Sequence, residues 1–440
     1  MRAGVAEAIE DAGVVGAGGA GFPTHIKARS EADIVIANYA ECEPLVASDT
    51  AVITQEPERV VRGLQLMQEA TRATRAVVAM KRKTEKGIQI LDKFSKTEKG
   101  FTVHLLDDVY PVGDEHVLVE EVTGRVVPQG GIPLEVSAVV SNVTTLWRVA
   151  LAEEGKAFTE RFVTVTGEVK APGTLLVPVG TPVSRLLTEC GGATVERPVL
   201  VMGGPMMGEI TQDTESPVRK TTTALIVLPQ DNALVRKRSA PISVDVRRAM
   251  AACMQCSDCT LLCPRYLLGH QLFPHKTMRS VAFWVRESEA ELASAMLCSE
   301  CGLCGVFACP MELSPVHVYQ HIKQELVRRG KVPELRREVT DPRPEREGRR
   351  IPLSRLVARL GLTAYEAKAP AKAELLEVAE VRIPLREKWG KLRATVLVGQ
   401  AVRKGDLLAE PFGKQPGARA HASIDGKIES VTEEFVHVAA

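Results

Sequence analysis

The 440-residue chain has almost no excess of charge of either sign, since 56 lysines and arginines stand against 55 aspartates and glutamates. This balance argues against a nucleic-acid-binding protein, which would carry a strong basic excess. No run of about 18 uncharged apolar residues is present, so no transmembrane helix is expected. The first residues, MRAGVAEAIEDAG, lack the apolar core of a secretory signal. We therefore expect a cytoplasmic protein, whose ten cysteines are ligands or catalysts rather than disulfides.

The length is too great for one hydrophobic core and predicts three or four domains. Hydrophobic residues make up 45% of the chain and charged residues 25%, the balance of an ordinary globular protein.

Eight of the ten cysteines form two runs. The first is Cys253-x2-Cys256-x2-Cys259-x3-Cys263-Pro264, and the second is Cys298-x2-Cys301-x2-Cys304-x4-Cys309-Pro310. The first run matches the C-x2-C-x2-C-x3-C-P pattern of two-cluster ferredoxins, and the second has one extra residue. Three closely spaced thiolates can bind three corners of one [4Fe–4S] cube, while the fourth Cys, before a proline, reaches the other cube. The spacing therefore predicts one cluster on Cys253, Cys256, Cys259 and Cys309, and another on Cys298, Cys301, Cys304 and Cys263.

Two other uses of these cysteines fit less well. Zinc sites usually take two separated pairs of ligands, and disulfides need an oxidising compartment. Between the runs, Val281–Met296 is predicted to be a helix, and a second helix after Pro310 is predicted to end at Gly330. Two adjacent clusters predict an electron-transfer path, with any hydride chemistry supplied by another part of the chain.

A glycine-rich segment, Gly16-Ala-Gly-Gly-Ala-Gly-Phe-Pro-Thr24, lies near the start and is followed by Lys27. Such a loop lets backbone N–H groups approach a phosphate. It is neither a Rossmann fingerprint, because a helical stretch rather than a strand precedes it, nor a P-loop, because no Gly-Lys-Ser/Thr follows. Taken alone, it is as consistent with a structural turn as with a binding site.

A buried strand is predicted at Ile34–Ala37, and Asn38, Glu41 and Glu43 follow it directly. Open α/β sheets bind ligands beyond the carboxyl ends of their strands, although a solvated acidic loop would give the same pattern. Strands alternate with helices over roughly the first 155 residues, which predicts an α/β layer with a mostly parallel sheet.

The order of GAGGAGFPTHIK, NYAECEP, YPVGDEHVL and SNVTTL resembles the FMN- and NADH-binding flavoprotein subunit of complex I. It is more similar to the RnfC component of the Rnf complex and to the cobalamin reductases of propanediol utilisation. The resemblance covers nearly the whole chain. It implies FMN as a cofactor beside two [4Fe–4S] clusters, and NADH as the electron donor.

The resemblance also implies which residues form the flavin and nicotinamide sites. The glycine loop and its lysine would hold the FMN phosphate and ribityl chain, Asn38 would contact the flavin ring, and the remaining residues would line or close the pocket. The residues implied are Gly16, Gly18, Gly19, Phe22, Lys27, Asn38, Glu41, Glu43, Tyr110, Gly113, Glu115, Asn142 and Thr144. No side chain is assigned a catalytic role, because the redox centres are the cofactors.

Two departures from the complex I pattern concern the nicotinamide site. That pattern has an Asp where this chain has Ala40, and it has more aromatic residues around the glycine loop. The resemblance therefore implies the flavin site more directly than the adenine end of the NADH site. Cys42, inside the acidic loop, is interpreted as a buried thiol, with a ligand role as the alternative.

The resemblance and the sequence pattern together predict a multidomain α/β and β protein. Residues 1–157 are expected to form a Rossmann-like FMN-binding α/β domain, 158–235 an SLBB domain of β-grasp type, and 240–332 a helical, ferredoxin-like domain for two [4Fe–4S] clusters. Residues 333–372, charged and proline-containing, are expected to be a linker. Residues 373–440 resemble a barrel-sandwich hybrid without the modified lysine hairpin of carrier domains, although Lys414 lies near that place. Cys190 and the pair Met206-Met207 are interpreted as core residues rather than ligands.

We therefore expect an enzyme, an oxidoreductase that transfers electrons from NADH through FMN and two clusters to an acceptor, either a corrinoid or a redox partner protein. The alternative is a subunit of a larger redox complex, membrane-associated or electron-bifurcating, with ferredoxin or another flavoprotein as partner. A scaffold that binds clusters without turnover is a third class, which bound flavin would argue against. A hetero-oligomer or homo-oligomer is expected, either free in the cytoplasm, peripheral to a membrane complex, or inside a bacterial microcompartment.

Overall fold

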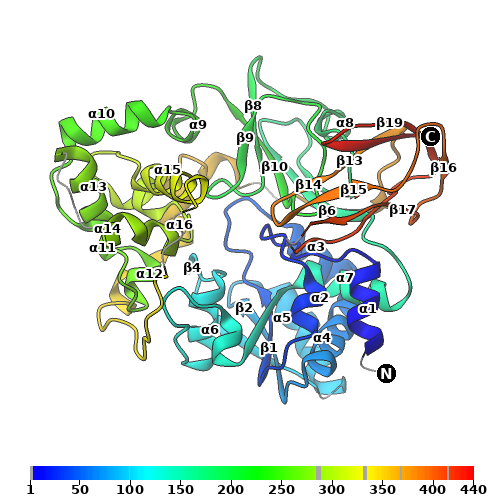
Figure 1. Ribbon diagram of the computed structural model, residues 1–440, viewed down its shortest axis with the longest axis horizontal. Helices are drawn as coiled ribbons and strands as arrows, with labels where there is room; N and C mark the ends of the chain where they lie inside the picture. Colours follow the sequence, from blue (N-terminus) through cyan, green and yellow to red (C-terminus); the bar gives the residue numbers. More distant parts are fainter. Residues whose placement is uncertain (1–2, 99, 284–288, 331–333, 367–368, 414–415) are drawn as a thin grey trace.

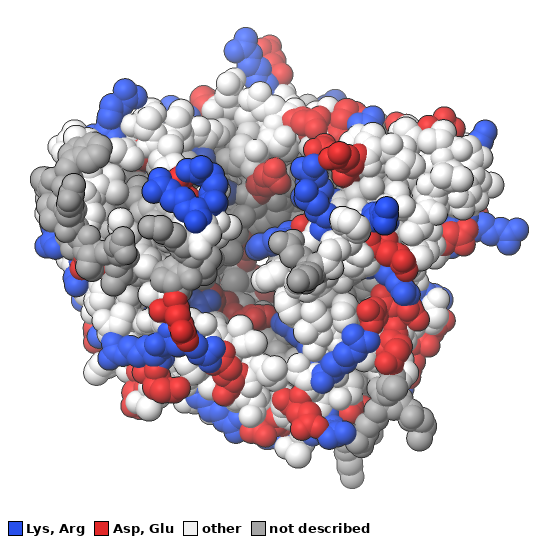
Figure 2. Space-filling view, in the orientation of Figure 1, with Lys and Arg blue, Asp and Glu red and all other residues white. Residues whose placement is uncertain are grey.

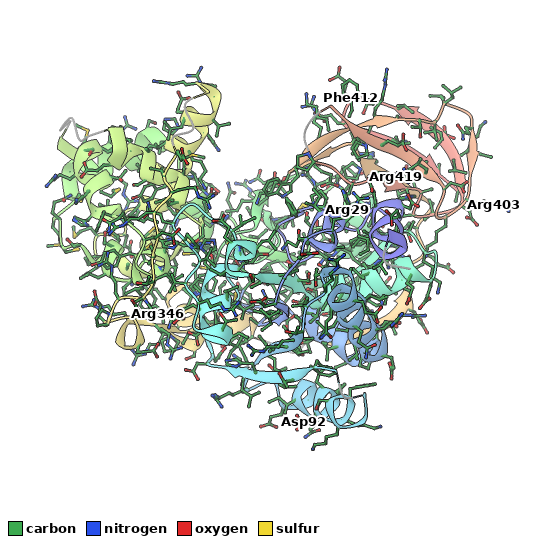
Figure 3. The ribbon with its side chains drawn as sticks, turned by 60° about the horizontal axis from the view of Figure 1, so that its bottom comes forward. Arg29, Asp92, Arg346, Arg403, Phe412 and Arg419 are labelled. Atoms are coloured by element: carbon green, nitrogen blue, oxygen red, sulfur yellow. The ribbon has the colours of Figure 1, made fainter. Side chains whose placement is uncertain are left out.

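The structure is a computed structural model that describes residues 1–440 apart from 1–2, 99, 284–288, 331–333, 367–368 and 414–415. Figure 1 shows four regions of the chain arranged around the centre of the view, and Figure 2 shows that the surface is hollowed there. Turned by 60°, the helical cysteine-rich region and the C-terminal sheets are seen as two lobes on opposite sides of the amino-terminal region (Figure 3). In the described residues, no helix is both long enough and apolar enough to span a membrane.

The amino-terminal region is built on a parallel four-stranded sheet of order β3-β2-β1-β5. Its strands are almost wholly apolar, as expected for parallel strands covered on both faces. The strands are β1 (Ile34–Tyr39), β2 (Arg75–Lys81), β3 (Thr102–Leu106), β4 (Val109–Tyr110) outside this sheet, and β5 (Ala138–Asn142). The helices are α1 (Ala3–Asp11), α2 (Thr24–Ala28), α3 (Ser48–Gln55), α4 (Pro57–Thr71), α5 (Glu85–Glu98), α6 (Glu115–Thr123), η1 (Pro133–Val136) and α7 (Val143–Glu153). This confirms the predicted parallel α/β layer.

The next region forms a mixed sheet of order β12-β7-β6-β10-β8-β9. Its own elements are β6 (Glu160–Gly167), β7 (Gly173–Pro178), α8 (Val183–Glu189), β8 (Pro198–Met202), β9 (Glu209–Thr211) and β10 (Ala224–Pro229). Cys190 is fully buried in the core of this sheet, and Met206 is buried as well, whereas Met207 is 55% exposed. The core role expected for the two methionines therefore holds for Met206 only.

The cysteine-rich region is helical. It comprises α9 (Ala233–Arg238), α10 (Ile242–Ala252), α11 (Asp258–Leu261), α12 (Pro264–Leu267), α13 (Pro274–Phe283), α14 (Glu289–Ala293), η2 (Ser294–Leu297), η3 (Cys304–Ala308, a π-helix) and α15 (Pro315–Arg328). The predicted helix Val281–Met296 partly lies outside the described residues. The described residues of this predicted helix belong to the end of α13, to α14 and to η2. The second predicted helix is α15, and Gly330 beyond its end has the left-handed φ of +66° typical of a C-terminal stop.

The segment predicted to be a linker contains regular structure. It holds η4 (Glu347–Arg349), β11 (Ile351–Pro352), α16 (Leu353–Arg359), η5 (Thr363–Tyr365) and β12 (Ala371–Leu375). β11 pairs with β4 and β12 with β7, while Leu356 is buried in a core shared with Tyr110. The buried guanidinium of Arg346 lies beside Glu120 and Glu121 of α6 (Figure 3). The charge composition of this segment predicted a solvated loop. The prediction was wrong because the carboxylates that pair with Arg346 lie more than two hundred residues earlier in the chain.

The C-terminal region forms two antiparallel sheets, of order β13-β20-β19-β16 and β14-β15-β17-β18, around one apolar core. The strands are β13 (Glu380–Pro384), β14 (Arg386–Glu387), β15 (Gly390–Ala394), β16 (Ala401–Val402), β17 (Leu407–Phe412), β18 (Ala420–His421), β19 (Gly426–Val431) and β20 (Phe435–Ala439). Lys220 joins three regions, because its buried ammonium donates to the carbonyl oxygens of Gly13 and Arg419 at 2.7 Å each.

Candidate functional site

The eight cysteines of the two runs line two cavities. One cavity is lined by Cys253, Cys256, Cys259 and Cys309, which we call the outer cysteine site. The other is lined by Cys263, Cys298, Cys301 and Cys304, which we call the inner cysteine site. Each cavity thus takes three cysteines from one run and the fourth from the other run. This is the crossover arrangement predicted from the spacing.

The two cysteine loops have the same backbone conformation. In the first run, Gln255 and Ser257 have φ of +56° and +70°, and in the second run Glu300 and Gly302 have φ of +62° and +81°. Two left-handed residues flank the second cysteine of each run. Because such residues cost energy in non-glycine positions, their repetition at matching places indicates a loop shape that the site requires.

The chemistry of the two sites fits [4Fe–4S] clusters better than single metal ions. Among the described side chains, no three His, Cys, Asp or Glu groups converge on one point that could hold a single ion. Four thiolates that bind a cube each bind a different iron, so their sulfurs surround a cavity instead. Burial raises the pKa of Cys259 and that of Cys263 to about 12. These thiols therefore keep their protons without iron and release them when iron binds.

The inner cysteine site is attached to the amino-terminal region by buried contacts. Tyr110, 3% exposed, donates a 2.8 Å hydrogen bond from its hydroxyl to the carbonyl oxygen of Cys301. Arg265, two residues after Cys263, forms a 2.9 Å ion pair with Asp114, and both side chains are nearly buried. The resemblance implies that Tyr110 belongs to the segment that closes over the flavin, and its hydroxyl points to the inner cysteine loop.

The glycine loop is closed by its own backbone, since the Gly16 N–H donates to the Phe22 carbonyl and the Gly21 N–H donates to the Gly16 carbonyl. A side chain at Gly18 would meet the amide of Asn142 at 3.1 Å, whereas the space around Gly19 is open. The loop thus presents its backbone closely on one side and leaves room on the other, as a phosphate or ribityl chain requires.

Lys27 lies on α2 beneath this loop and points toward the carboxyl end of the parallel sheet. Its ammonium donates to Glu115 and to the carbonyl of Val140, each at 2.8 Å. The structure therefore brings Lys27 and Glu115, 88 residues apart, into one pair. The resemblance implies that this cation, held beside β5, binds the FMN phosphate.

The acidic loop after β1 is held by hydrogen bonds on every predicted residue. Asn38 donates to the Gly113 carbonyl at 3.0 Å, which joins two of the predicted segments. Glu41 accepts from Thr50 and from the Asp49 N–H, and burial raises the pKa of Glu41 to about 7. Glu43 accepts from the Met206 N–H at 2.9 Å, and burial raises its pKa to about 7 as well.

Asn142 and Thr144 converge on a residue that sequence reasoning missed. Asn142 caps α7 by accepting from the Thr144 N–H, and its amide donates to Asp49 at 2.6 Å. The Thr144 hydroxyl donates to the same carboxylate at 2.9 Å. Asp49 lies in ASDT, a short polar stretch that reads as an ordinary helix start, so its role as the common acceptor had no sequence signal.

Two more charged residues position the site without having been predicted. Arg161 of β6 is fully buried and donates to the Ala17 carbonyl of the glycine loop at 3.2 Å and to the Lys220 carbonyl. Lys81, at the end of β2, donates to the Glu41 carbonyl at 2.9 Å. For Lys81, a cation at the end of the apolar run Ala76–Met80 was the available signal, whereas Arg161 lies in a strand that also holds Glu160, Thr164 and Thr166.

Some buried polar atoms in the acidic loop and at the end of β5 have no protein partner among the described residues. They include one carboxylate oxygen of Glu43 and the hydroxyl of Ser141, next to Asn142. Buried polar groups are nearly always paired, so these atoms fit a bound polar ligand such as a flavin. Cys42 lies behind Gly113, and burial raises its pKa to about 12, which supports a buried thiol rather than a nucleophile.

Known protein families match three parts of this chain. The Nuo51 FMN-binding domain matches residues 9–151, the SLBB domain residues 162–209, and the 4Fe-4S dicluster domain residues 252–314. The glycine loop, the acidic loop and both cysteine runs lie within these ranges.

Similar proteins cover the chain more widely. It is 38% identical over 436 residues to the cobalamin reductase PduS of Salmonella typhimurium, covering 99% of this chain and 96% of the relative. It is 31% identical over 263 residues to the C component of the Na(+)-translocating ferredoxin:NAD(+) oxidoreductase complex of Acetobacterium woodii, covering 58% of this chain and 57% of the relative. A chain of an air-oxidized NAD+-reducing [NiFe]-hydrogenase has a similar fold, with a TM-score of 0.51 at 20% identity over 83% of this chain and 67% of that one.

Proposed function

The chain belongs to the family of the PduS cobalamin reductases, and from that premise we propose that it transfers electrons from NADH to a corrinoid through FMN and two [4Fe–4S] clusters. When bound, the flavin would take up a hydride and pass on single electrons, which the clusters would carry. The observation that carries the proposal is the buried contact between the two halves of the path. Tyr110 and Asp114 from the flavin-binding region meet Cys301 and Arg265 of the inner cysteine site.

These contacts support an order for the two clusters. The inner cysteine site adjoins the flavin-binding region and includes Cys263 and Cys301, each 9% exposed. The outer cysteine site includes the exposed Cys256, next to Met254, which is 64% exposed. We infer that electrons enter at the inner site and leave at the outer site, where an acceptor can approach closely.

The chain's own residues would hold the flavin and tune its surroundings. The glycine loop offers backbone N–H groups and Lys27 offers a cation to the FMN phosphate. The unpaired oxygen of Glu43 is a buried acceptor that a polar ligand could satisfy, and Asn38, which the resemblance assigns to the flavin ring, is held by its bond to the Gly113 carbonyl. Glu41 and Glu43 have pKa values near 7, so either can hold a proton close to the ring at neutral pH.

A protein acceptor is the second candidate. The sequence contains no Asp-x-His-x-x-Gly motif for holding a corrinoid. Exposed apolar side chains line the outer site, with Met254 64% and Met311 41% exposed. Components of ion-translocating complexes are relatives as well. A transient docking surface would serve either a corrinoid or a protein. An activity assay with each acceptor therefore distinguishes them.

Several finer expectations belong to this proposal. The division at residues 157, 235 and 332, the barrel-sandwich hybrid at the C-terminus and the assembly into an oligomer are proposed on the family and the fold, whereas the expected boundary at 372 falls inside β12. A place in the cytoplasm, next to a membrane complex or inside a microcompartment, is proposed on the same grounds.

The test is anaerobic purification, quantitation of iron, sulfide and flavin, and rapid mixing with NADH while flavin and cluster absorbance are followed. We expect about eight irons and one FMN per chain, all reduced by NADH. The Cys190→Ser variant is the matched control, because Cys190 is a buried cysteine outside both sites and should leave the iron content unchanged. Cofactors that are present but not reduced by NADH would contradict the donor and favour a subunit that receives electrons from a partner protein.

A further inference from the structure

A hairpin of the C-terminal sheet contacts the glycine loop. β14 and β15 are joined at Lys388 and Trp389, both exposed at the tip. The Trp389 indole N–H donates to the Ala20 carbonyl at 2.7 Å, although the two residues lie 369 positions apart. The Trp389 ring also meets the Phe22 ring edge to face, with centroids 5.1 Å apart and planes at 89°.

This contact explains a glycine of the loop. Gly21 has a φ of +72°, and a side chain there would meet Thr221 at 3.2 Å and Trp389 at 3.7 Å. The loop is therefore shaped to receive the hairpin as well as a phosphate.

The base of the hairpin lies near a buried cation. Glu387 and Lys220 line one cavity with Gly21 and Trp389. Burial raises the pKa of Glu387, and the charge of Lys220 opposes that rise. Since Lys220 also holds the Gly13 and Arg419 carbonyls, the base of the hairpin is tied to both neighbouring regions.

We propose that Trp389 and Phe22 together form the ring-stacking part of the nicotinamide dinucleotide site, with Lys388 as a cation for the dinucleotide phosphates. Two adjacent aromatic rings, one of them 39% exposed, beside a phosphate-type loop match a ligand that combines planar rings with phosphates. The C-terminal region then completes the donor site in addition to packing against it. This inference rests on the proposed function, because it assigns a subsite to the same donor.

The test compares Trp389→Ala and Trp389→Phe with the unchanged chain, each loaded with FMN and clusters. Stacking on an aromatic side chain contributes about 1–3 kcal/mol, so we expect KM for NADH to rise about tenfold or more in Trp389→Ala, with kcat for an artificial dye little changed. Trp389→Phe should recover most of the affinity. Phe412→Ala is the matched control, since Phe412 is an exposed ring of the same sheet that packs with Arg393, and it should leave KM unchanged.

A binding measurement adds a readout independent of turnover. Titration with NAD+ should quench tryptophan fluorescence in the unchanged chain and do so much less in Trp389→Phe. Equal flavin content and equal reduction of the clusters by dithionite would show that each variant is intact. An unchanged KM in Trp389→Ala together with equal quenching in Trp389→Phe would overturn the stacking role. Failure of NADH to reduce the unchanged chain would instead overturn the donor itself.

Discussion

The inner and outer cysteine sites share a loop conformation and differ in their surroundings. Left-handed residues occur at matching places in the two loops, and each site borrows its fourth cysteine from the other run. Yet Cys301 is buried and its carbonyl is hydrogen-bonded to Tyr110, while Cys256 is exposed beside Met254. The comparison teaches that the sequence motif sets the loop geometry, whereas the packed neighbours set how far each site is exposed.

The largest expected effect distinguishes the site where electrons enter from the site where they leave. In Cys301→Ser the inner cluster should be lost or damaged, and NADH should then reduce the flavin but not the outer cluster, so that acceptor reduction falls more than about a hundredfold. In Cys256→Ser the inner cluster should still be reduced by NADH. Rapid-mixing absorbance and low-temperature EPR of each variant distinguish the two. Reduction of the outer cluster at normal speed in Cys301→Ser would contradict the proposed order.

Removal of iron should follow the same difference in exposure. An anaerobic chelator should take about half of the iron quickly, from the outer site, and the rest slowly, because the inner cysteines are shielded by the flavin-binding region. Absorbance measures the rate of iron release in each phase. The Cys256→Ser variant is the reference, because it should show the slow phase alone. A single release rate for all the iron would show that the sites are equally accessible.

The ion pair between Arg265 and Asp114 is one of the buried contacts between the inner cysteine site and the amino-terminal region. Replacing Arg265 with Met leaves a nearly buried carboxylate without its partner, which typically costs about 3 kcal/mol or more. We expect a clear fall in the apparent melting temperature by anaerobic calorimetry. Lys96→Met is the control, because Lys96 pairs with Asp92 at 4.0 Å on the surface and such pairs contribute less than about 1 kcal/mol.

Glu43 connects the acidic loop to Met206, which packs against Gly302 of the inner loop. Burial raises its pKa from 4.5 to about 7, so on raising the pH the unfolded chain loses this proton first and stability falls between those values. Glu43→Gln should remove that fall and gain about 3 kcal/mol relative to the unchanged chain on going from pH 4.5 to pH 8. Apparent melting temperatures across this range check it, with the exposed Glu209→Gln as control. Parallel pH profiles for Glu43→Gln and the unchanged chain would show that the carboxyl titrates normally.

The smallest expected effect concerns the hydroxyl of Tyr110. Tyr110→Phe keeps the ring in its core and removes only the bond to the Cys301 carbonyl, worth about 1 kcal/mol. A potentiometric titration should show a shift in the inner cluster and none in the outer cluster. Equal shifts, or none, would mean that the hydroxyl serves packing alone.

Local sequence determined most of what could be predicted. The cysteine spacing predicted both ligand sets, and the alternation of strands and helices predicted the parallel sheet that places Asn38, Lys81 and Asn142 at one edge. What could not be predicted depends on partners distant in the chain. Arg265 has no signal until Asp114 is brought beside it, and Trp389 is an ordinary hairpin residue until it meets the glycine loop. The segment 351–360 looked like a linker because its apolar residues pack against Tyr110, which lies far away in sequence.

The single ammonium of Lys220 has a consequence for how such a protein can evolve. It satisfies carbonyl groups from the first and last regions of the chain while itself belonging to the middle one. An exchange of the C-terminal region for an unrelated one would leave a buried cation short of an acceptor unless the new region supplied a carbonyl at the same point. In sequence the regions look like interchangeable modules. Because of this contact, however, we expect the three regions to be kept together in evolution.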